Sequence, residues 1–252
     1  MSIKIALITG GSRGIGKSTA LKTAQQGIDV ILTYHSKEEE ALSVVAEIKA
    51  MGRQAAALHL DAGKSQSFGD FAAQVSNLLS DKWQRKDFDF LVNNAGIGIN
   101  ASFEETTESQ FDELMNIHFK GVFFLTQKLL PMIADNGRII NVSSGLTRFA
   151  LPGYSAYAAM KGGIEVLTKY MAKELGHRKI AVNVVAPGAI ETDFGGGVVR
   201  DNHEVNAFIA SGTSLGRVGL PDDIGGVIAS MLSENNAWIN AQRIEASGGI
   251  FI

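Results

Sequence analysis

The chain has 252 residues, of which 45% are hydrophobic and 19% are charged, and its formal net charge at pH 7 is −3. A chain of this length can bury a large core as one α/β domain over residues 1–252, and its weakly acidic charge excludes the basic surface on which binding to nucleic acid or an acidic membrane depends. The chain has no cysteine, which excludes disulfides and thiolate metal sites.

Short apolar runs alternate with longer segments of helical periodicity along the whole chain. Strands are predicted at 3–9, 29–33, 55–60, 90–93, 138–143 and 181–186, and helices at 17–26, 37–51, 65–79, 107–133, 157–175 and 221–232. This alternation predicts an α/β fold with a doubly wound parallel sheet and helices on both faces. No linker, internal repeat or low-complexity tract interrupts the pattern, which favours a single domain.

The first predicted strand runs into a glycine-rich turn, Thr9-Gly-Gly-Ser-Arg-Gly-Ile-Gly16. The glycines follow a G-x-x-x-G-x-G spacing, which differs from the commoner G-x-G-x-x-G fingerprint. Glycine permits a tight turn and close approach of the backbone, and the free N–H groups of the following helix attract a diphosphate. Four glycines within seven residues are more than an ordinary connection needs. The turn therefore predicts a dinucleotide site made by Gly10, Ser12, Arg13, Gly14, Ile15 and Gly16.

The second predicted strand ends near Tyr34, where NAD-specific sites usually carry an acidic residue that holds the ribose 2′-hydroxyl. His35, Ser36 and Lys37 follow, and Arg13 lies in the glycine turn. A 2′-phosphate needs cationic and hydroxyl donors of this kind, so the sequence favours NADP(H) over NAD(H). A solvated surface loop is the alternative interpretation of His35 and Lys37.

Small and polar residues follow the third and fourth predicted strands. Asp61 and Ala62 are placed to flank an adenine ring. The segment Asn93-Asn-Ala-Gly96 has the small residues that let a strand end approach a cofactor closely. The cofactor residues predicted in this part of the chain are Asp61, Ala62, Asn93, Asn94, Ala95 and Gly96.

The fifth predicted strand leads through Ser143 and Ser144 to a helix that carries Tyr157 and Lys161. Because these two residues are four apart, they share one face of the helix. A phenol beside an ammonium group loses its proton more readily, and a serine hydroxyl from the strand end can hydrogen-bond the same reacting oxygen. The spacing occurs by chance on many helices, so its meaning depends on the surrounding motifs.

Taken together, these motifs resemble those of the short-chain dehydrogenase/reductase family. The chain has Thr-Gly-x-x-x-Gly-x-Gly at 9–16, Asn-Asn-Ala-Gly at 93–96, Ser at 144, Tyr-x-x-x-Lys at 157–161 and Pro-Gly at 187–188. Segments 216–221 and 247–249 are also similar, so the resemblance covers essentially the whole chain. It implies a single-domain Rossmann fold that interconverts a ketone and a secondary alcohol with NADP(H). The body of the sequence is similar to 3-oxoacyl-[acyl-carrier-protein] reductase-like members, so a 3-oxoacyl thioester is one candidate for the ketone, and the sequence does not identify the substrate.

The resemblance also implies a role for each matching residue. Tyr157 corresponds to the general acid of reduction, and Lys161 to the residue that holds the nicotinamide ribose and lowers the tyrosine pKa. Ser144, rather than Ser143, has the spacing of the serine that polarises the carbonyl. Tyr154 has no lysine four residues later and is interpreted as a wall of the pocket. The segment that resembles the one meeting the cofactor carboxamide contains Pro187, Gly188, Ile190 and Thr192.

One position departs from the family pattern. Many members carry a catalytic asparagine before a Gly-Val-Phe-like segment, and alignment on Gly121 places His118 there. Asn116 lies about 200° away around an α-helix and is not a simple substitute. The family role uses a backbone carbonyl that holds a water for proton relay, so His118 can retain it. The imidazole either joins the relay, because its pKa is near working pH, or merely packs within the helix.

A largely apolar substrate pocket is predicted beside this machinery. Residues 193–213, which include three consecutive glycines at 195–197, are predicted to form a mobile lid over it. Arg148 either lies near the mouth of the pocket, where it would favour an anionic group, or is a solvated surface residue. The predicted pocket residues are Gly145, Leu146, Phe149, Leu151, Tyr154, Phe194 and Val198.

The family resemblance implies a homotetramer, assembled through helices at 107–130 and 157–175 and through the C-terminal strand. We expect a small-molecule carbonyl or alcohol substrate, and no metal, nucleic-acid or membrane partner. The N-terminal apolar run is too short for a signal peptide and no run approaches 18 residues, so a cytoplasmic protein is predicted. The alternative function is a catalytically silent NADP(H)-binding regulator or scaffold.

Overall fold

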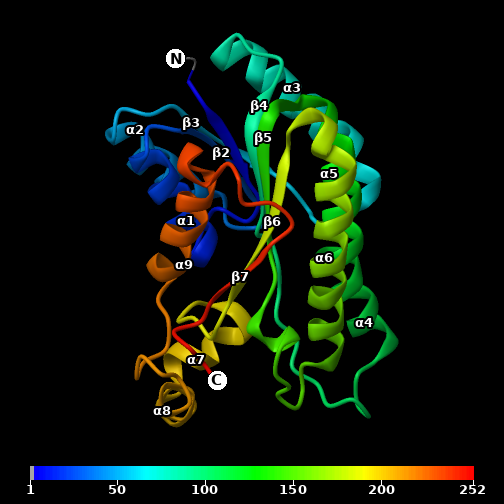
Figure 1. The fold of residues 1–252 in the computed structure, drawn as a ribbon, viewed down its shortest axis with the longest axis vertical. Helices are drawn as coiled ribbons and strands as arrows, with labels where there is room; N and C mark the ends of the chain where they lie inside the picture. Colours follow the sequence, from blue (N-terminus) through cyan, green and yellow to red (C-terminus); the bar gives the residue numbers. More distant parts are fainter. Residues whose placement is uncertain (1–2) are drawn as a thin grey trace.

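A seven-stranded parallel sheet forms the centre of the protein in a computed structural model that describes residues 3–252 (Figure 1). The strand order is β3-β2-β1-β4-β5-β6-β7, and every neighbouring pair is parallel. The predicted doubly wound sheet is therefore confirmed. The strands are β1 (Ile5–Ile8), β2 (Asp29–Tyr34), β3 (Ala55–His59), β4 (Phe88–Asn93), β5 (Ile133–Val142), β6 (Ala181–Pro187) and β7 (Arg243–Ala246).

Helices cover both faces of the sheet, and each face has its own hydrophobic core. On one face, α1 (Gly14–Gln25), α2 (Glu38–Ala50) and α9 (Pro221–Leu232) pack on the strands. On the other face, the strands are covered by α3 (Phe68–Trp83), α5 (Gly121–Leu129) and α6 (Ser155–Glu174). The central strands β1 and β4 are fully buried between these layers, which explains their continuous apolar sequences. The remaining helices are α4 (Glu108–Met115), α7 (Val198–Asp201) and α8 (His203–Ser211).

The strand order reverses between β1 and β4, which are neighbours although β2 and β3 lie between them in sequence. In open α/β sheets, ligands bind beyond the carboxyl ends of the strands at such a reversal, because the two connections leave toward opposite faces and open a crevice. The glycine turn after β1 and the segment after β4 therefore meet at the same point.

The long helix predicted at 107–133 is wrong in its middle and at its end. A π-helical turn at Asn116–Lys120 separates α4 from α5, because the Gly121 N–H bonds to the Asn116 carbonyl. A 3₁₀ turn at Leu130–Met132 ends the helical segment, and Ile133 already pairs with Phe88 as the first residue of β5. Hydrophobic periodicity did not indicate β7, a short and partly polar edge strand, although the family resemblance implied a C-terminal strand.

Within residues 3–252, no helix combines the length and the apolar character that crossing a bilayer would require.

Candidate active site

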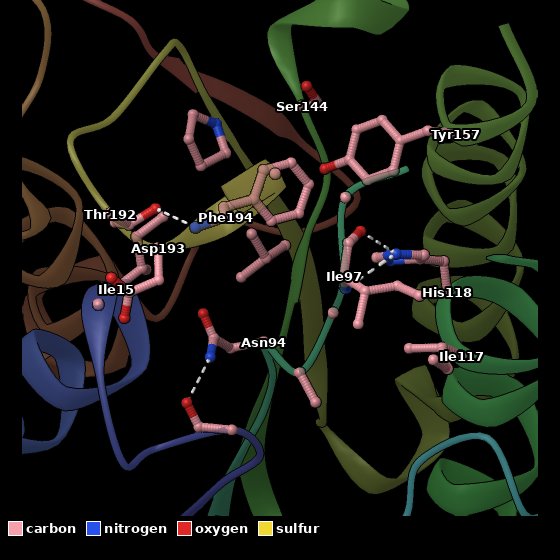
Figure 2. A pocket seen from close by; sticks show the side chains of 18 of the residues that line it. Ile15, Asn94, Ile97, Ile117, His118, Ser144, Tyr157, Thr192, Asp193 and Phe194 are labelled. Atoms are coloured by element: carbon pink, nitrogen blue, oxygen red, sulfur yellow. Dashed lines mark hydrogen bonds between the residues drawn. The ribbon is translucent and has the colours of Figure 1, made fainter. Parts of the chain in front are cut away.

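A large cavity lies at the carboxyl edge of the sheet (Figure 2), with a volume of about 1210 Å³. Cavities that hold one drug-sized ligand are typically about 300–1,000 Å³, so this one has room for a dinucleotide and a substrate together. With the exception of Asn93, every residue predicted to bind the cofactor or to catalyse the reaction lines it.

The glycine turn forms one end of this cavity. Gly10 and Gly14 have φ values of +67° and +55°, in the left-handed region that favours glycine. A Cβ on Gly16 would lie 2.0 Å from the Gly10 carbonyl oxygen, so α1 packs against the turn without room for a side chain. The N-cap residue of α1, Arg13, makes no side-chain capping bond, and the first turn contains no acidic residue. The N–H groups in the first turn of α1 are therefore available to an anion such as a diphosphate.

The turn is fastened to the end of β4 by polar contacts. The Thr9 hydroxyl accepts hydrogen bonds from the backbone N–H groups of Asn94 and Ala95, both at 3.0 Å. The Asn94 amide in turn donates to the carbonyls of Thr9 and Gly10 at 2.8 and 3.1 Å. These bonds fix the relative position of two segments that the sequence predicts to contact the cofactor.

Asn93 corrects one of the predictions. Its side chain is buried and donates to Thr126 at 3.0 Å and to Asn141 at 2.8 Å. Asn141 continues the chain by donating to Thr168 on α6. Asn93 thus joins β4 to β5 and the helix layer and does not line the cavity. Asn94 follows the last residue of β4, and its side chain instead contacts the glycine turn.

The ends of β2 and β3 bring a mixed group of charges to the cavity. His35 Nε2 lies 3.7 Å from the Asp61 carboxylate, which also pairs with Lys64 at 3.2 Å. Ser36 and Ala62 line the same region. Glu38 hydrogen-bonds the Tyr34 hydroxyl and raises the pKa of that phenol.

Arg13 has an ionic partner that the sequence did not indicate. Its guanidinium lies 3.1 Å from Asp193, which also pairs with Arg200 of the predicted lid. Both side chains of the first pair are largely exposed, so the contact is weak in energy. Arg13 nevertheless remains at the cavity wall.

Ser144, Tyr157 and Lys161 converge on the other end of the cavity, where Figure 2 shows the Tyr157 hydroxyl pointing inward. Ser144 has an extended backbone (φ −158°), and its hydroxyl accepts a bond from the Leu146 N–H at 3.2 Å. Lys161 is buried, and its Nζ donates to the Val142 carbonyl at 2.8 Å. The same Nζ lies 5.6 Å from the centre of the Tyr157 ring.

Burial dominates the electrostatics of this group. It raises the pKa of the Tyr157 phenol well above its ordinary value, and a hydrogen bond with the Ser144 hydroxyl offsets only part of the increase. Burial also lowers the pKa of Lys161 to about 7. The predicted lowering of the tyrosine pKa by Lys161 acts together with the positive charge of the oxidised nicotinamide, so it stays a prediction for the complex with the cofactor. The lysine is directed to the Val142 carbonyl and the ring, and removing both groups from water favours their neutral forms.

His118 lies in the π-helical turn with 1% of its surface exposed. Its Nε2 is 2.8 Å from the Ile97 carbonyl oxygen, and its Nδ1 is buried without a partner among the described residues. The imidazole meets the Tyr157 ring edge-on, with centroids 5.1 Å apart. Burial and, secondarily, the nearby Lys161 charge lower the pKa of His118 well below its usual range. The expectation of a pKa near working pH is therefore wrong, because the ring is desolvated.

His118 makes folding sensitive to acid. Its folded-state pKa is lowered, so below about pH 6.5 the unfolded chain binds a proton that the folded chain does not. We expect the free energy of unfolding to fall by about 1.4 kcal/mol per pH unit from this group as pH drops below about 6.5. Urea unfolding at pH 7.5 and 5.5 measures this loss, which His118→Asn should remove. The exposed His177→Asn should leave it in place, and equal acid sensitivity of wild type and His118→Asn would contradict the assignment.

The predicted lid forms short helical segments beyond β6. Gly195, Gly196 and Gly197 all have left-handed φ values, between 61° and 79°, so the chain turns sharply after Phe194. The Phe194 ring packs on Tyr157 at 5.5 Å between centroids and lines the cavity beside the phenol. The predicted apolar residues all line the cavity. Further apolar wall residues on the lid and at the C-terminus were not predicted from the sequence, namely Val199, Val205, Phe208, Ile209 and Ile250.

Arg148 is exposed at the surface, as one of its two interpretations predicted, but it is ion-paired and does not line the large cavity. Its guanidinium pairs with Glu245 at 2.7 Å and donates to the carbonyls of Ile250 and Phe251 at 2.6 and 3.1 Å. It therefore ties the loop after β5 to β7 and the C-terminal segment and does not line the large cavity. These partners lie about 100 residues away in sequence, so no local pattern indicates them.

The residues described by the structure include no group of three or more histidine, aspartate or glutamate side chains arranged to hold a metal ion.

Comparison with known proteins places this cavity in a family. Residues 10–250 match the family described as Enoyl-(Acyl carrier protein) reductase. The hydroxynaphthalene reductase-like protein Arp2 of Metarhizium brunneum is 34% identical, over 98% of this chain and 94% of its own length. The short chain dehydrogenase/reductase nsrJ of Aspergillus novofumigatus is 32% identical, over 98% and 95%. The crystal structure of the angucycline C-6 ketoreductase LanV with bound NADP superposes with a TM-score of 0.93 at 35% identity, covering 98% of this chain and 95% of LanV.

The family match spans nearly the whole chain, and both relatives exceed 30% identity over almost their full lengths. The sheet order, the glycine turn and the Ser144, Tyr157 and Lys161 group agree with it in one molecule. This chain belongs to the short-chain dehydrogenase/reductase family of oxidoreductases.

Proposed function

We propose that the protein is an NADP(H)-dependent ketoreductase that interconverts a ketone and a secondary alcohol. The observation that carries the proposal is the convergence of Ser144, Tyr157 and Lys161 on the same cavity as the glycine turn. A regulator that had lost its chemistry would not need a buried lysine beside a buried tyrosine. The intact group therefore favours an enzyme over a silent NADP(H)-binding protein.

The residues present fit NADP(H). The glycine turn and the N-terminus of α1 would hold the diphosphate, while Asn94, Ala95 and Gly96 would lie along the middle of the cofactor. Tyr34 occupies the strand end where an acidic residue would repel a 2′-phosphate. The 2′-phosphate would be held by Arg13, His35 and Ser36, and LanV, a similar ketoreductase, has NADP bound in its crystal structure. The carboxamide end would be met by Pro187, Gly188, Ile190 and Thr192.

When bound, the nicotinamide supplies or accepts the hydride, and the protein supplies position and proton transfer. In the reductive direction, the Tyr157 phenol would give its proton to the carbonyl oxygen of the substrate. The Ser144 hydroxyl would donate a hydrogen bond to the same oxygen and stabilise its developing charge. The raised pKa of Tyr157 keeps the phenol protonated at neutral pH, as a proton donor requires.

Lys161 and the π-helical turn would return a proton to Tyr157. With a pKa of about 7, the buried Lys161 can give and take a proton near neutral pH. A π-helical turn loosens the backbone hydrogen bonding of a helix and often marks a functional site. We propose that the backbone of this turn holds the relay water, while the neutral His118 ring positions Tyr157 by its edge-on contact.

The cavity walls favour an apolar ketone with rings over an acyl chain on a carrier protein. The substrate end is lined by Phe149, Leu151, Tyr154, Phe194 and Phe208. A phosphopantetheine arm or an acidic carrier needs free cations at the mouth. Arg148 is paired with Glu245, and Arg200 of the lid is paired with Asp193 and Asp201. These two arginines are neutralised within the protein, which supports a neutral, aromatic substrate.

A substrate panel tests this function directly. We expect NADPH oxidation with bicyclic and tricyclic aromatic ketones, with kcat/KM at least about tenfold above that for 3-oxoacyl thioesters, a difference of about 1.4 kcal/mol. We also expect tighter binding of NADPH than of NADH in fluorescence titrations. Absence of turnover across the whole panel would contradict the function. Faster turnover of 3-oxoacyl thioesters would overturn the ring-ketone proposal alone, and tighter NADH binding would overturn the cofactor assignment.

We propose a homotetramer. Large apolar side chains stay 40–64% exposed on the outer faces of α5 and α6, which supports burial against a second copy. Sedimentation equilibrium should give four chains, and a monomer at micromolar concentration would refute this assembly. The exposed residues are Phe123, Phe124, Val166 and Tyr170.

A further inference from the structure

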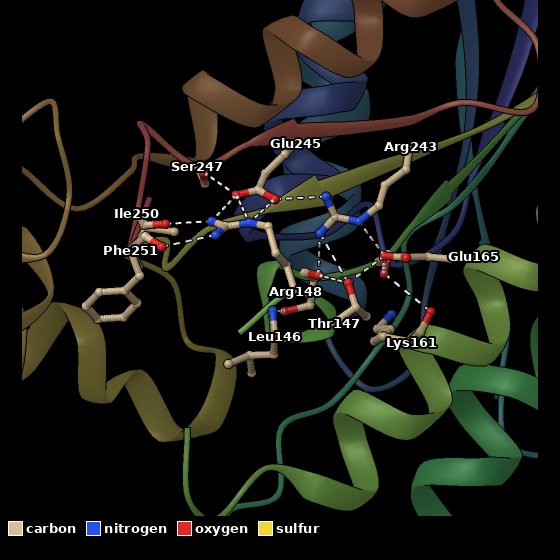
Figure 3. A network of polar contacts seen from close by, with 12 residues as sticks. Leu146, Thr147, Arg148, Lys161, Glu165, Arg243, Glu245, Ser247, Ile250 and Phe251 are labelled. Carbon is tan, nitrogen blue, oxygen red and sulfur yellow. Dashed lines mark hydrogen bonds and ion pairs between the residues drawn. The ribbon is translucent and has the colours of Figure 1, made fainter. Parts of the chain in front are cut away.

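A second group of charged residues contacts the segment that carries Ser144 (Figure 3). It consists of Arg148, Glu165, Arg243 and Glu245, called here the charged network. Two arginines and two glutamates balance in charge, and the side chains of Glu165 and Arg243 are 19% and 24% exposed. Glu165, Arg243 and Glu245 do not line the cavity, so they do not touch a bound cofactor or substrate.

Glu165 fastens the segment that carries Ser144 to the catalytic helix. Its Oε1 accepts hydrogen bonds from the Ser143 hydroxyl at 2.8 Å and from the Arg243 Nε at 2.7 Å. The Thr147 hydroxyl lies 2.7 Å from the same oxygen. Ser143 and Thr147 lie on either side of Ser144 in sequence. The Glu165 carboxylate on α6 therefore restrains the chain both before and after Ser144.

Arg243 restrains Ser144 from the other side. Its Nη2 lies 3.3 Å from the Ser144 carbonyl oxygen and 3.1 Å from the Thr147 hydroxyl. Its Nη1 pairs with Glu245 at 2.8 Å, which fixes the guanidinium on β7. The Arg148 guanidinium lowers the pKa of Glu245 to about 2, so this carboxylate stays ionised.

The same segment has a third attachment, at Val142. The Lys161 Nζ donates to the Val142 carbonyl, and Glu165 lies one helical turn after Lys161. Residues 142–147 are therefore bonded to two successive turns of α6 and to β7. Charge-assisted bonds of this kind are shorter and stronger than neutral ones and fix geometry as well as energy.

We propose that Glu165 and Arg243 are positioning residues that hold the Ser144 hydroxyl where it meets Tyr157 and the substrate carbonyl. The inference rests on the proposed ketoreductase function. It assigns a catalytic purpose to ionic contacts that would otherwise only stabilise the fold. Because the network does not line the cavity, its loss should affect the chemical step and leave cofactor binding unchanged.

The test compares Glu165→Ala and Arg243→Met with wild type on the best ketone of the panel. Misplacing a catalytic group by about 1 Å can cost about 100-fold, so we expect kcat to fall about 10- to 100-fold. The dissociation constant for NADPH should stay within about twofold, since no cofactor contact is lost. Arg243→Lys keeps the positive charge but loses the planar set of N–H donors of the guanidinium. Its kcat should therefore lie between those of Arg243→Met and wild type.

The matched control is Arg178→Met. Arg178 has the same 24% side-chain exposure as Arg243, and it bonds Asp135 and the carbonyls of Leu130 and Ile133 away from the cavity. Its loss should leave kcat unchanged while lowering the melting temperature to a similar extent. If the control lowers kcat as much as Arg243→Met does, the network has only a structural role.

A double-mutant cycle with Ser144→Ala separates positioning from stability. If Glu165 acts through Ser144, Glu165→Ala should lower kcat by less than about threefold in the Ser144→Ala background, where the hydroxyl is absent. An equal loss in both backgrounds overturns the proposal, as does an unchanged kcat for Glu165→Ala. Should Glu165→Ala fail to fold, Arg243→Lys in the two backgrounds gives the same comparison. A wild-type enzyme without ketone turnover overturns both this inference and the proposed function.

Discussion

Tyr157→Phe is expected to lower kcat for ketone reduction by about 1,000-fold, because general acid catalysis contributes about 10²- to 10⁴-fold. The substitution removes one oxygen from a buried ring and keeps its packing against Phe194 and His118. Ser144 can still donate a hydrogen bond to the carbonyl oxygen, but no phenol proton remains to complete the alcohol. Stopped-flow or steady-state NADPH oxidation measures the loss.

Tyr154→Phe is the matched control for this variant. Tyr154 also lines the cavity, but it precedes α6 and has no lysine four residues after it. Its substitution should change kcat by less than about tenfold, as expected for a wall residue that makes uniform binding contacts. NADPH affinity should be unchanged in both variants. If Tyr157→Phe keeps more than about a tenth of the wild-type kcat, another group donates the proton, since general acid catalysis is worth at least about 100-fold.

The fold could be predicted from the sequence because its signals are local. Buried parallel strands such as β1 and β4 are continuous apolar runs, and the glycine turn marks the first strand–helix connection. A parallel sheet brings strand ends that are far apart in sequence to one edge. Ser144 and Thr192 therefore line the same cavity as the glycine turn. The order of the motifs along the chain is therefore enough to predict which residues share the cavity.

The missed features depend on contacts between distant segments. Periodicity continues smoothly through His118, yet the chain forms a π-helical turn there, with Gly121 packed too closely on the Ala62 carbonyl for a Cβ. The role of Arg148 is set by Glu245 and by two C-terminal carbonyls. The pKa of Tyr157 depends on how deeply the ring is buried, which its lysine spacing does not reveal.

Under the proposed function, one end of the cavity binds the diphosphate and the other transfers the proton. Cofactor binding can therefore be tested without changing the catalytic side chains. The proposed diphosphate cradle consists of backbone from the turn between β1 and α1 and from the start of α1, while the proposed proton-transfer group comes from the loop after β5 and from α6. A substitution in the cradle should therefore abolish dinucleotide binding without touching the catalytic side chains. Gly16 is the most informative position for this experiment, because the packing around it leaves no room for a Cβ.

Gly16→Ala is expected to raise the NADPH dissociation constant by at least about 100-fold. The new Cβ would lie 2.0 Å from the Gly10 carbonyl oxygen and 2.6 Å from the Asn94 amide, so the turn must move away from α1. Two charge-assisted hydrogen bonds to a diphosphate, each worth about 1.5–3 kcal/mol, would be lost with it. Overpacking at this position should also lower the free energy of unfolding by about 1–3 kcal/mol.

Gly162→Ala is the control for Gly16→Ala, because it makes the same substitution at a glycine where a Cβ has room. Gly162 lies inside α6 beside Lys161, and a Cβ there meets no atom within 4 Å. Alanine is favoured over glycine in a helix by about 1 kcal/mol, so this variant should be slightly more stable and bind NADPH normally. Fluorescence titration and urea unfolding of both variants give the comparison. Normal NADPH affinity in Gly16→Ala would mean that the glycine turn does not hold the diphosphate, whereas weakened affinity in both would point to a general sensitivity of the fold.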